Sequence, residues 1–328
     1  MRVVLFCLLL AGCGGKPGGP AVRIAMAGTG LQTQLVPMLV AQALGYYREE
    51  GVTVTFENLA TIEKAMQAMI GGSVDVASNS YSQILLVSAE GQRVRAFFVG
   101  LRRNSFVLVV APAAAGRIRR AEDLKGAVIG TVGATGLPFL HHYLGAHGLR
   151  PGEFSTVTIG VGMPAIAAVE SGRLDAANVA GGDHIRLLRR HPSLRILVDS
   201  STPEGMRETF GSEAYSAGVL SAKQSWLDAN PDTARRVARA TRRGLQWMAA
   251  HSFEEIREKL PEAFRSEDAA LDLDVLRWAR DGYTKDGRMP AGSPEAWKRL
   301  LGTVSERVRD AKIDLAATWT DEYLSESK

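Results

Sequence analysis

Cysteine is nearly absent from this sequence, and so are the motifs that mark most enzymes. The two cysteines, Cys7 and Cys13, lie close to the amino terminus, so no disulfide can join parts of the body of the chain. No Gly-x-Ser-x-Gly elbow, Walker loop or paired metal-ligand motif follows them. The histidines His141, His142 and His147 lack the i, i+4 spacing of a helical zinc pair. We therefore expect no metal, no cofactor and no catalytic residue.

Long apolar runs are also missing, apart from a short one at the amino terminus. Arg2 precedes the apolar residues 3–10, and the small residues Ala11 and Gly12 follow them. This order is typical of a signal peptide, and the run is far shorter than the about 20 apolar residues of a transmembrane helix. We predict that residues 1–12 are a lipoprotein signal peptide and that the glycine-rich residues 13–20 form a flexible tether.

The four residues that end at Cys13 resemble the bacterial lipobox, in which the cysteine is alkylated with diacylglycerol and becomes the acylated first residue. This resemblance implies an exported protein, anchored by lipid on Cys13 to a bacterial membrane and facing the periplasm or the cell exterior. Several acyl chains hold firmly, because each buried methylene contributes about 0.8 kcal/mol, whereas one chain binds only marginally.

The charge balance gives little indication of a partner, because the formal net charge is only +4. The one dense basic cluster consists of Arg235, Arg236, Arg239, Arg242 and Arg243, spaced along one helical face. We expect a solvated face there. Aromatic residues are not interleaved with these arginines, so we expect no nucleic-acid binding.

A segment of the first third of the chain reappears about a hundred residues later. Residues 70–77 read IGGSVDVA and residues 170–177 read ESGRLDAA, so glycine, aspartate and alanine coincide. We expect the repeated Asp75 and Asp175 to hold turns rather than to bind a ligand. Each copy lies in the same predicted context of strand, glycine-containing loop, helix, strand, helix and strand.

The two copies predict two α/β lobes. Strands are expected at 22–27, 52–57 and 74–78 and again at 127–132, 156–160 and 174–179, with helices at 35–45, 62–70, 137–147 and 164–171. This alternation is typical of parallel sheets built from right-handed strand-helix-strand units.

Two further apolar strands predict how the lobes are joined. We expect residues 106–111, which precede Pro112, to end the first part of lobe 1, and residues 217–220 to return the chain to it. Lobe 1 would then comprise residues 21–111 and 217–328, with residues 112–216 forming lobe 2 and two crossings forming a hinge.

The remaining third of the chain is predicted to be helical and to pack on lobe 1. Asn230 before Pro231 is typical of a helix start. Further helices are expected around 253–264, 272–281 and 294–310.

Four stretches resemble the nitrate/sulfonate/taurine-type family of bacterial solute-binding proteins, whose superfamily includes proteins that bind thiamine pyrimidine precursors and other heterocycles. They are residues 22–25, residues 43–54, which read ALGYYREEGVTV, and residues 71–77 and 121–130. Membership implies the periplasmic-binding-protein fold, capture of a small polar or anionic solute between the lobes, and delivery to the transmembrane subunits of an ABC permease. We expect a monomer.

Ligands of open parallel sheets bind beyond the carboxyl ends of the strands, and here those positions are polar and rich in glycine. The expected ligand contacts are Thr29, Gly30, Gln32, Thr61, Asn79, Ser80 and Tyr81 in lobe 1, Thr135, Gly136, Met163, Asn178, Gly181, Gly182 and Asp183 in lobe 2, and Asn104 and Glu213 near the crossings. The alternatives to ligand contact are that the glycine loops are plain turns, that Tyr81 packs on a helix and that Asp183 caps a helix. Free N–H groups at helix starts favour an anion, whereas Glu213 favours an amine, so the ligand's charge stays open.

Two other functions remain open at this point. An enzyme acting on a small metabolite in the same cleft would use Asp183 or the histidines of residues 141–147. The eukaryotic pyrimidine synthases of this superfamily carry a cysteine-rich motif that this sequence lacks, which argues against an enzyme. A receptor that signals to a sensor protein is the second alternative.

Overall fold

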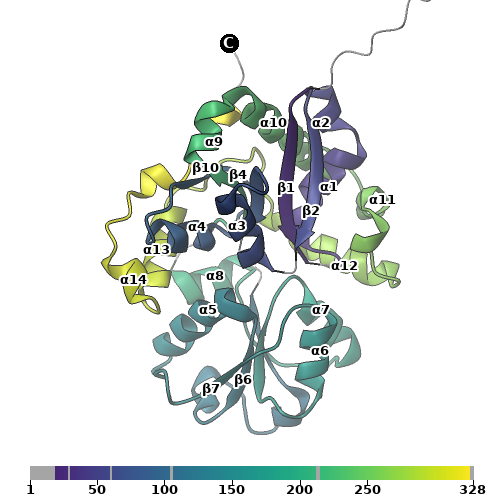
Figure 1. The fold of residues 1–328 in the computed structure, drawn as a ribbon. Coiled ribbons are helices and arrows are strands. Elements are labelled where there is room, and N and C mark those ends of the chain that lie inside the picture. The colour runs from purple at the N-terminus through teal and green to yellow at the C-terminus, as the bar shows by residue number, and fades with distance from the viewer. Residues whose placement is uncertain (1–18, 29, 60, 104–105, 212–214, 326–328) are drawn as a thin grey trace, which may run out of the picture.

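The computed structural model describes residues 19–28, 30–59, 61–103, 106–211 and 215–325. Cys13, the predicted signal peptide and most of the predicted tether lie outside these residues, as do Thr29, Asn104 and Glu213. Two five-stranded sheets, each flanked by helices, form an upper and a lower lobe (Figure 1).

The first sheet has the strand order β2-β1-β3-β10-β4. Its strands are β1 (Ala21–Ala27), β2 (Thr53–Leu59), β3 (Val76–Asn79), β4 (Val94–Leu101) and β10 (Gly218–Lys223). β1 pairs in parallel with both β2 and β3, whereas β10 runs antiparallel to β3 and β4.

The second sheet repeats this arrangement with the order β7-β6-β8-β5-β9. Its strands are β5 (Val107–Val110), β6 (Val128–Thr131), β7 (Ser155–Thr158), β8 (Ala176–Val179) and β9 (Ile196–Asp199). β5 has the same position in the second sheet as β10 has in the first, and it runs antiparallel to β8 and β9. The two-lobed α/β fold is therefore confirmed, with one correction: each sheet is mixed, because one of its strands is antiparallel.

The strand at Val107–Val110 also corrects the predicted boundary of the first lobe. It was expected to end the first lobe, but it pairs with β8 and β9 of the second sheet. An apolar run buried on both faces has the same sequence pattern in either sheet, so its pairing could not be read from the residues. The chain thus crosses before β5, and it returns between α8 and β10.

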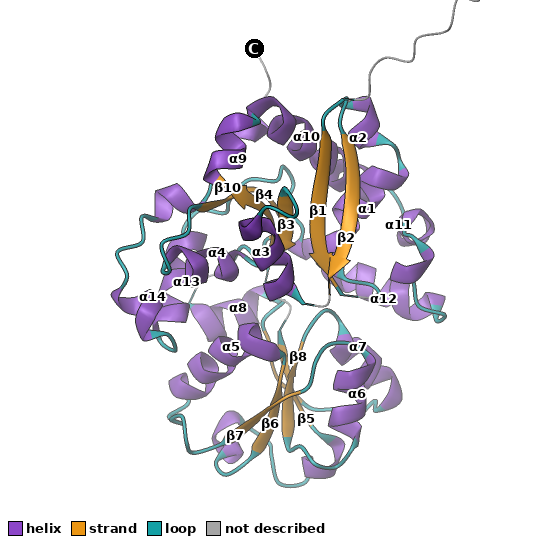
Figure 2. Cartoon of the chain, viewed as in Figure 1, coloured by secondary structure: helices purple, strands orange, loops and turns teal. Residues whose placement is uncertain are grey.

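The helices of the two lobes follow the repeated pattern (Figure 2). In the first lobe they are α1 (Val36–Ala43), α2 (Tyr46–Glu49), α3 (Ile62–Gly71) and α4 (Tyr81–Ser88), and in the second α5 (Gly133–Ala146), α6 (Met163–Glu170), α7 (Asp183–Arg190) and α8 (Pro203–Phe210).

The carboxyl-terminal third is helical and lies mostly on the first lobe (Figure 1). It contains α9 (Gln224–Ala229), α10 (Pro231–Ala250), α11 (Phe253–Lys259), α12 (Ala269–Ala279), α13 (Ser293–Gly302) and α14 (Glu306–Asp310). α10 crosses α1 so closely that a Cβ on Gly244 would lie 2.3 Å from the carbonyl oxygen of Pro37. α12 and α13 also contact α7 and α5 of the second lobe, which the sequence did not predict.

The repeated aspartates have the same role in the two lobes. The Oδ2 atom of Asp75 accepts a hydrogen bond from the backbone N–H of Arg23 at 2.8 Å, and Asp175 Oδ2 accepts one from Val128 N–H at 2.8 Å. Asp75 directly precedes β3 and bonds a residue of β1, and Asp175 directly precedes β8 and bonds the first residue of β6. The expected structural role of this pair agrees with the geometry.

The arginine cluster on α10 is not a free solvated face, contrary to the prediction. Arg239 Nε donates to Glu50 Oε2 at 2.8 Å, and Arg236 donates to the backbone oxygen of Glu50 at 2.9 Å. Arg243 bonds Glu50 as well and lies over the ring of Tyr46 at 4.0 Å. These arginines attach α10 to α2. No helix of the described residues is long and apolar enough to cross a bilayer.

Candidate ligand-binding cleft

A cleft of about 540 Å³ lies between the two lobes. Its lining comprises Ala27, Gly28, Gln32, Gln34, Asn58, Leu59, Thr61, Ile62 and Glu63 from the first lobe and Val132, Thr158, Gly160 and Val161 from the second. These residues end or follow β1, β2, β6 and β7. The cleft is therefore at the carboxyl ends of parallel strands, where open α/β sheets bind ligands.

The loop after β1 forms one wall and depends on glycine. Gly28 and Gly30 have φ values of 108° and 69°, which L side chains rarely adopt. Asn58 at the end of β2 donates from Nδ2 to the Gly28 oxygen at 2.9 Å, and Gly30 N–H donates to Ala263 O at 3.1 Å. These bonds fix the loop that carries Gln32 into the cleft.

The first turn of α3 forms the adjoining part of this wall. Thr61 caps the helix, because its hydroxyl oxygen accepts a hydrogen bond from Lys64 N–H at 3.2 Å. Ile62 and Glu63 follow and line the cleft beside Leu59. The cap uses one acceptor position of Thr61, so its hydroxyl proton is still available to a ligand.

The loop between β7 and α6 forms the opposite wall in the second lobe. Gly160 and Gly162 have φ values of 74° and 75°, and Val161 between them is 39% exposed. Gly162 N–H donates to Asp183 Oδ2 at 2.8 Å. Asp183 is buried at the first turn of α7, and this burial raises its pKa to about 6. Asp183 therefore holds the loop from behind and does not line the cleft.

Three of the predicted ligand contacts are fully buried. Asn79 Nδ2 donates to Ser221 Oγ at 2.8 Å, and the Tyr81 hydroxyl bonds that of Thr318. Asn178 Nδ2 donates to the Gly136 oxygen at 3.0 Å. All three bind neighbouring elements of their own lobe and support the cleft walls, and their contact with a ligand stays a prediction.

The other predicted residues divide into neighbours of the cleft and residues outside its lining. Ser80 accepts a hydrogen bond from Ser82 Oγ at 2.9 Å, and Met163 is 54% exposed beside the cleft loop. Gly136 and Thr135 lie in the first turn of α5, where the side chain of Thr135 is outside the described part.

Gly181 and Gly182 lie where the lobes meet. A Cβ on Gly181 would be 3.7 Å from Gln32 Oε1 of the first lobe. One on Gly182 would be 3.0 Å from the methyl groups of Val275 on α12. Their φ values of 62° and 91° also favour glycine. We find that these two residues permit close contact between the lobes.

Of the thirteen described lining residues the sequence predicted only Gln32 and Thr61, and the eleven it missed include Gln34, Asn58, Glu63 and Val161. Asn58 was overlooked because the strand was predicted to end at Glu57, one residue short of it. The other three lie within the first turns or loops after the strands, where the same carboxyl-end rule could have found them.

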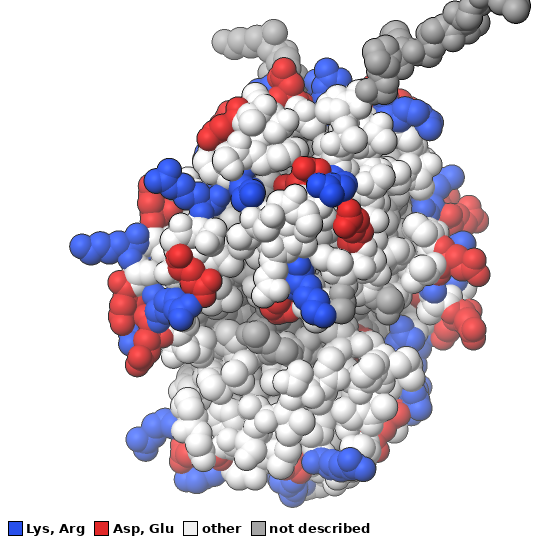
Figure 3. All heavy atoms as spheres, viewed as in Figure 1, with Lys and Arg blue, Asp and Glu red and all other residues white. Residues whose placement is uncertain are grey.

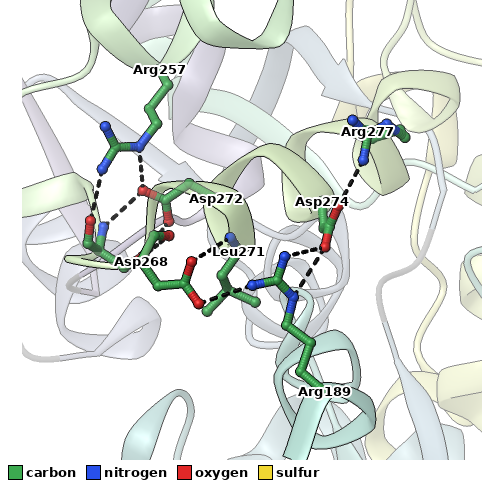
Figure 4. A network of polar contacts seen from close by, with 8 residues as sticks. Arg189, Arg257, Asp268, Leu271, Asp272, Asp274 and Arg277 are labelled. Carbon is green, nitrogen blue, oxygen red and sulfur yellow. Dashed lines mark hydrogen bonds and ion pairs between the residues drawn. The ribbon is translucent and has the colours of Figure 1, made fainter. Parts of the chain in front are cut away.

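An ion-pair network joins the second lobe to the carboxyl-terminal third (Figure 4). Arg189 at the end of α7 contacts two carboxylates of the α12 region: its Nη1 is 2.9 Å from Asp268 Oδ2, and its Nη2 is 2.5 Å from Asp274 Oδ2. Arg257 on α11 donates from Nε to Oδ2 of Asp272 at 2.9 Å, and Asp272 lies on α12 together with Asp274. The network therefore ties the second lobe to the carboxyl-terminal third.

Trp278 adds a second contact between the lobes. Its Nε1 donates to Ser201 Oγ at 2.7 Å, and its ring packs edge-on against His184, with centroids 5.1 Å apart. His184 is buried, and this burial lowers its pKa. Among the described residues, no group of three or more His, Cys, Asp and Glu could hold a metal ion.

Comparison with known proteins agrees with this architecture. The family model described as "NMT1/THI5 like" matches residues 32–254. This chain belongs to the NMT1/THI5-like family.

Three curated relatives of this NMT1/THI5-like chain are YtlA of Bacillus subtilis, the riboflavin-binding protein RibY of Chloroflexus aurantiacus, and the 4-amino-5-hydroxymethyl-2-methylpyrimidine phosphate synthase THI12 of Saccharomyces cerevisiae. YtlA is 23% identical over 83% of this chain and 79% of its own length. RibY is 24% identical over 89% and 82%, and THI12 is 20% identical over 88% and 84%.

Two solved structures show the same fold. A protein of Bordetella bronchiseptica RB50 superposes with a TM-score of 0.81 at 29% identity, covering 93% of this chain and 95% of that one. The alkanesulfonate-binding protein SsuA of Xanthomonas axonopodis, bound to MOPS, has a TM-score of 0.67 at 16% identity and covers 93% and 99%.

Proposed function

We propose that this protein is an extracytoplasmic solute-binding component of an ABC importer, which captures a small molecule between its lobes and presents it to the permease. The observation that carries this proposal is the cleft, which both lobes line at the carboxyl ends of their strands. Binding proteins such as RibY and SsuA share the family or the fold, which supports the same role here.

The lobes are arranged for hinge closure on a ligand. Two crossings link the sheets, and a ligand held by both walls would stabilise the closed form. The Arg189 network and Trp278 lie on the lobe boundary and would help to set the closed geometry. The protein would act as a monomer, since both walls come from one chain.

Ligand-dependent stabilisation tests this role. A ligand raises the free energy of unfolding by RT ln(1 + [L]/Kd), so a true solute shifts the melting temperature further as its excess over Kd grows. We expect such a shift, with a bound mass in native mass spectrometry, for one member of a panel of sulfonates, nitrate, pyrimidines and flavins. Failure of the whole panel in both measurements would overturn the proposal for these solutes.

The anchor at Cys13 is a separate part of the proposal. Replacing Cys13 by Ala should move the protein from the membrane fraction to the soluble extracytoplasmic fraction, while ligand binding by the folded lobes stays unchanged. Retention of the variant in the membrane fraction would contradict lipidation at this residue.

An enzyme is the second candidate, because the THI12 relative is named as a synthase. The lining of the cleft offers Glu63 as an acid or base and no cysteine among the described residues. Incubation of the protein with a retained ligand separates the two functions: a binding protein releases the ligand unchanged, whereas a synthase converts it.

Deletion of the gene would leave uptake of the solute unchanged if the protein served a sensor instead of an importer.

A further inference from the structure

The cleft carries an unusual charge distribution for a protein whose type includes anion receptors. Of its described lining residues, Glu63 alone ionises, and none is lysine, arginine or histidine. Lys64 follows Glu63 but is exposed and does not line the cleft. The lining thus offers one negative side chain and no positive one to a ligand.

Within residues 19–325, the residues outside the described part include no lysine, arginine or histidine. Between residues 19 and 325 they are Thr29, Ala60, Asn104, Ser105 and the segment 212–214, which reads SEA. None of them is a cation. Figure 3 shows the outer surface of the second lobe: in this view its front is largely uncharged, and its Lys, Arg, Asp and Glu side chains lie along its margin.

A carboxylate of the chain itself already occupies the helix start on the second wall. A helix N-terminus attracts anions through its free N–H groups. Here Gly162 N–H, at the start of α6, donates to Asp183 Oδ2 at 2.8 Å. An anionic ligand at this place would have to displace Asp183 and would lie close to a second carboxylate.

The remaining lining residues are apolar or neutral and polar, and they come from both lobes. Leu59 and Ile62 on the first lobe and Val132 and Val161 on the second give apolar surface on the two walls. Gln32, Gln34 and Asn58 supply side-chain amides, which donate and accept hydrogen bonds without adding charge. Such a lining suits a compact apolar or aromatic body with a neutral or cationic polar edge.

We propose that the cleft binds a small apolar or aromatic compound without negative charge, and that Glu63 gives it a preference for one bearing a protonated amino or amidinium group. This inference rests on the proposed solute-binding function and narrows its ligand class. Sulfonates, nitrate and carboxylates are excluded by the carboxylate of Glu63 and by the lack of a compensating cation in the lining. The side-chain amides of Gln32, Gln34 and Asn58 form hydrogen bonds with the uncharged polar groups of the ligand.

Matched probes of different charge test the inference on the full chain. The panel contains nitrate, taurine, alkanesulfonates and nicotinate as anionic or sulfonated compounds, nicotinamide, thymine and cytosine as uncharged ones, and 3-(aminomethyl)pyridine and benzamidine as cations. Native mass spectrometry and calorimetric titration identify the binders. We expect them only among the uncharged and cationic probes.

The Glu63→Gln variant then tests the role of the carboxylate. It keeps the size of the side chain and removes its charge, so binding of a cationic probe should weaken about tenfold while that of an uncharged probe changes less than about twofold. Glu254→Gln, an exposed glutamate of α11, is the matched control and should change neither. Equal weakening of both probe classes by Glu63→Gln would contradict a charge preference.

The outcomes separate this inference from the proposed function. Tight binding of a sulfonate, nitrate or a carboxylate leaves a solute-binding protein in place and overturns the inference. Absence of binding by every probe, with no small molecule retained from the cell, overturns both.

Discussion

Arg189 and Asp274 connect the two lobes by a pair of hydrogen bonds to one oxygen, since Nε and Nη2 of the guanidinium lie 3.1 and 2.5 Å from Asp274 Oδ2. Arg189 belongs to α7 of the second lobe, and Asp274 to α12 of the carboxyl-terminal third. About a third of each side chain is exposed, so the pair is only partly screened by water.

Replacing Arg189 by Ala should loosen the junction of the lobes. The loss of contacts to two carboxylates should lower the melting temperature only slightly and should increase the radius of gyration in small-angle X-ray scattering. Arg190→Ala is the matched control, because Arg190 Nε binds Glu170 Oε1 at 2.9 Å within the same lobe. An equal expansion in both variants would show that Arg189 has no special role between the lobes.

Asp183 predicts a pH dependence of stability. Burial raises its pKa from 3.8 to about 6, so the folded chain binds this proton more tightly than the unfolded chain does. The stability that the raised pKa contributes is therefore present below pH 3.8 and is lost as the pH rises through about 6, with a total on the order of 3 kcal/mol. Asp183→Asn keeps an acceptor for Gly162 N–H but cannot ionise.

The measurement compares melting temperatures of the native chain and the Asp183→Asn variant between pH 4 and pH 8. The variant should gain stability relative to the native chain as the pH rises, and the difference should change most between pH 4 and about 6. A difference that stays constant across this range would mean that Asp183 has an ordinary pKa.

Gly136 predicts a steric effect behind the second wall of the cleft. A Cβ at this position would lie 2.7 Å from Asn178 Nδ2 and 2.8 Å from Thr131 Oγ1, and both residues are buried. Gly136→Ala should therefore destabilise the protein by about 1–3 kcal/mol. Gly145→Ala on the same helix is the control, because its added methyl group would have no atom within 4 Å, and it should be neutral or stabilising by up to about 1 kcal/mol.

Chemical denaturation measures both glycine variants. A destabilised Gly136→Ala beside an unchanged Gly145→Ala would locate the effect at Asn178 and Thr131. Equal effects at the two positions would instead point to helix propensity.

The equivalent aspartates predict a loss of stability in each lobe, and Asp175, which also pairs with Arg117, should give the larger one. Asp75→Ala and Asp175→Ala each remove a charged acceptor from a backbone N–H, so each should cost about 1.5–3 kcal/mol without changing the affinity for a ligand. Asp310→Ala removes an exposed carboxylate paired with the adjacent Arg309 and should cost little. A loss of ligand affinity at constant stability would assign Asp75 or Asp175 to the cleft.

The sequence predicted the duplicated strands and helices because they follow clear periodicities. Gly72 and Gly172 end equivalent helices, and the strands β1, β3, β6 and β8 lie within a few residues of their expected positions. β5 was placed in the wrong lobe, because strand pairing is decided by contacts distant in the chain.

The candidate site was predicted less well than the fold. The rule that ligands bind at the carboxyl ends of parallel strands predicted the position of the cleft, and it correctly predicted that Gln32 and Thr61 line it. It could not distinguish residues that face the cleft from those that face the core, so Tyr81 and Asn178 were expected to contact a ligand although both are fully buried. Glu63, two residues after Thr61, lies in the helix turn after β2 and was missed although the same rule covers that turn.

The placement of β5 and β10 makes the two repeats depend on each other for folding, and it indicates how they came together in one chain. The first repeat, β1 to β4, is followed by a strand that inserts into the second sheet, and the second repeat, β6 to β9, is followed by one that inserts into the first. The chain thus has the connectivity of a dimer that exchanged its fifth strands and later became fused. Neither repeat completes its own sheet, so a chain cut between β5 and β6 would yield fragments that are stable only when both are present.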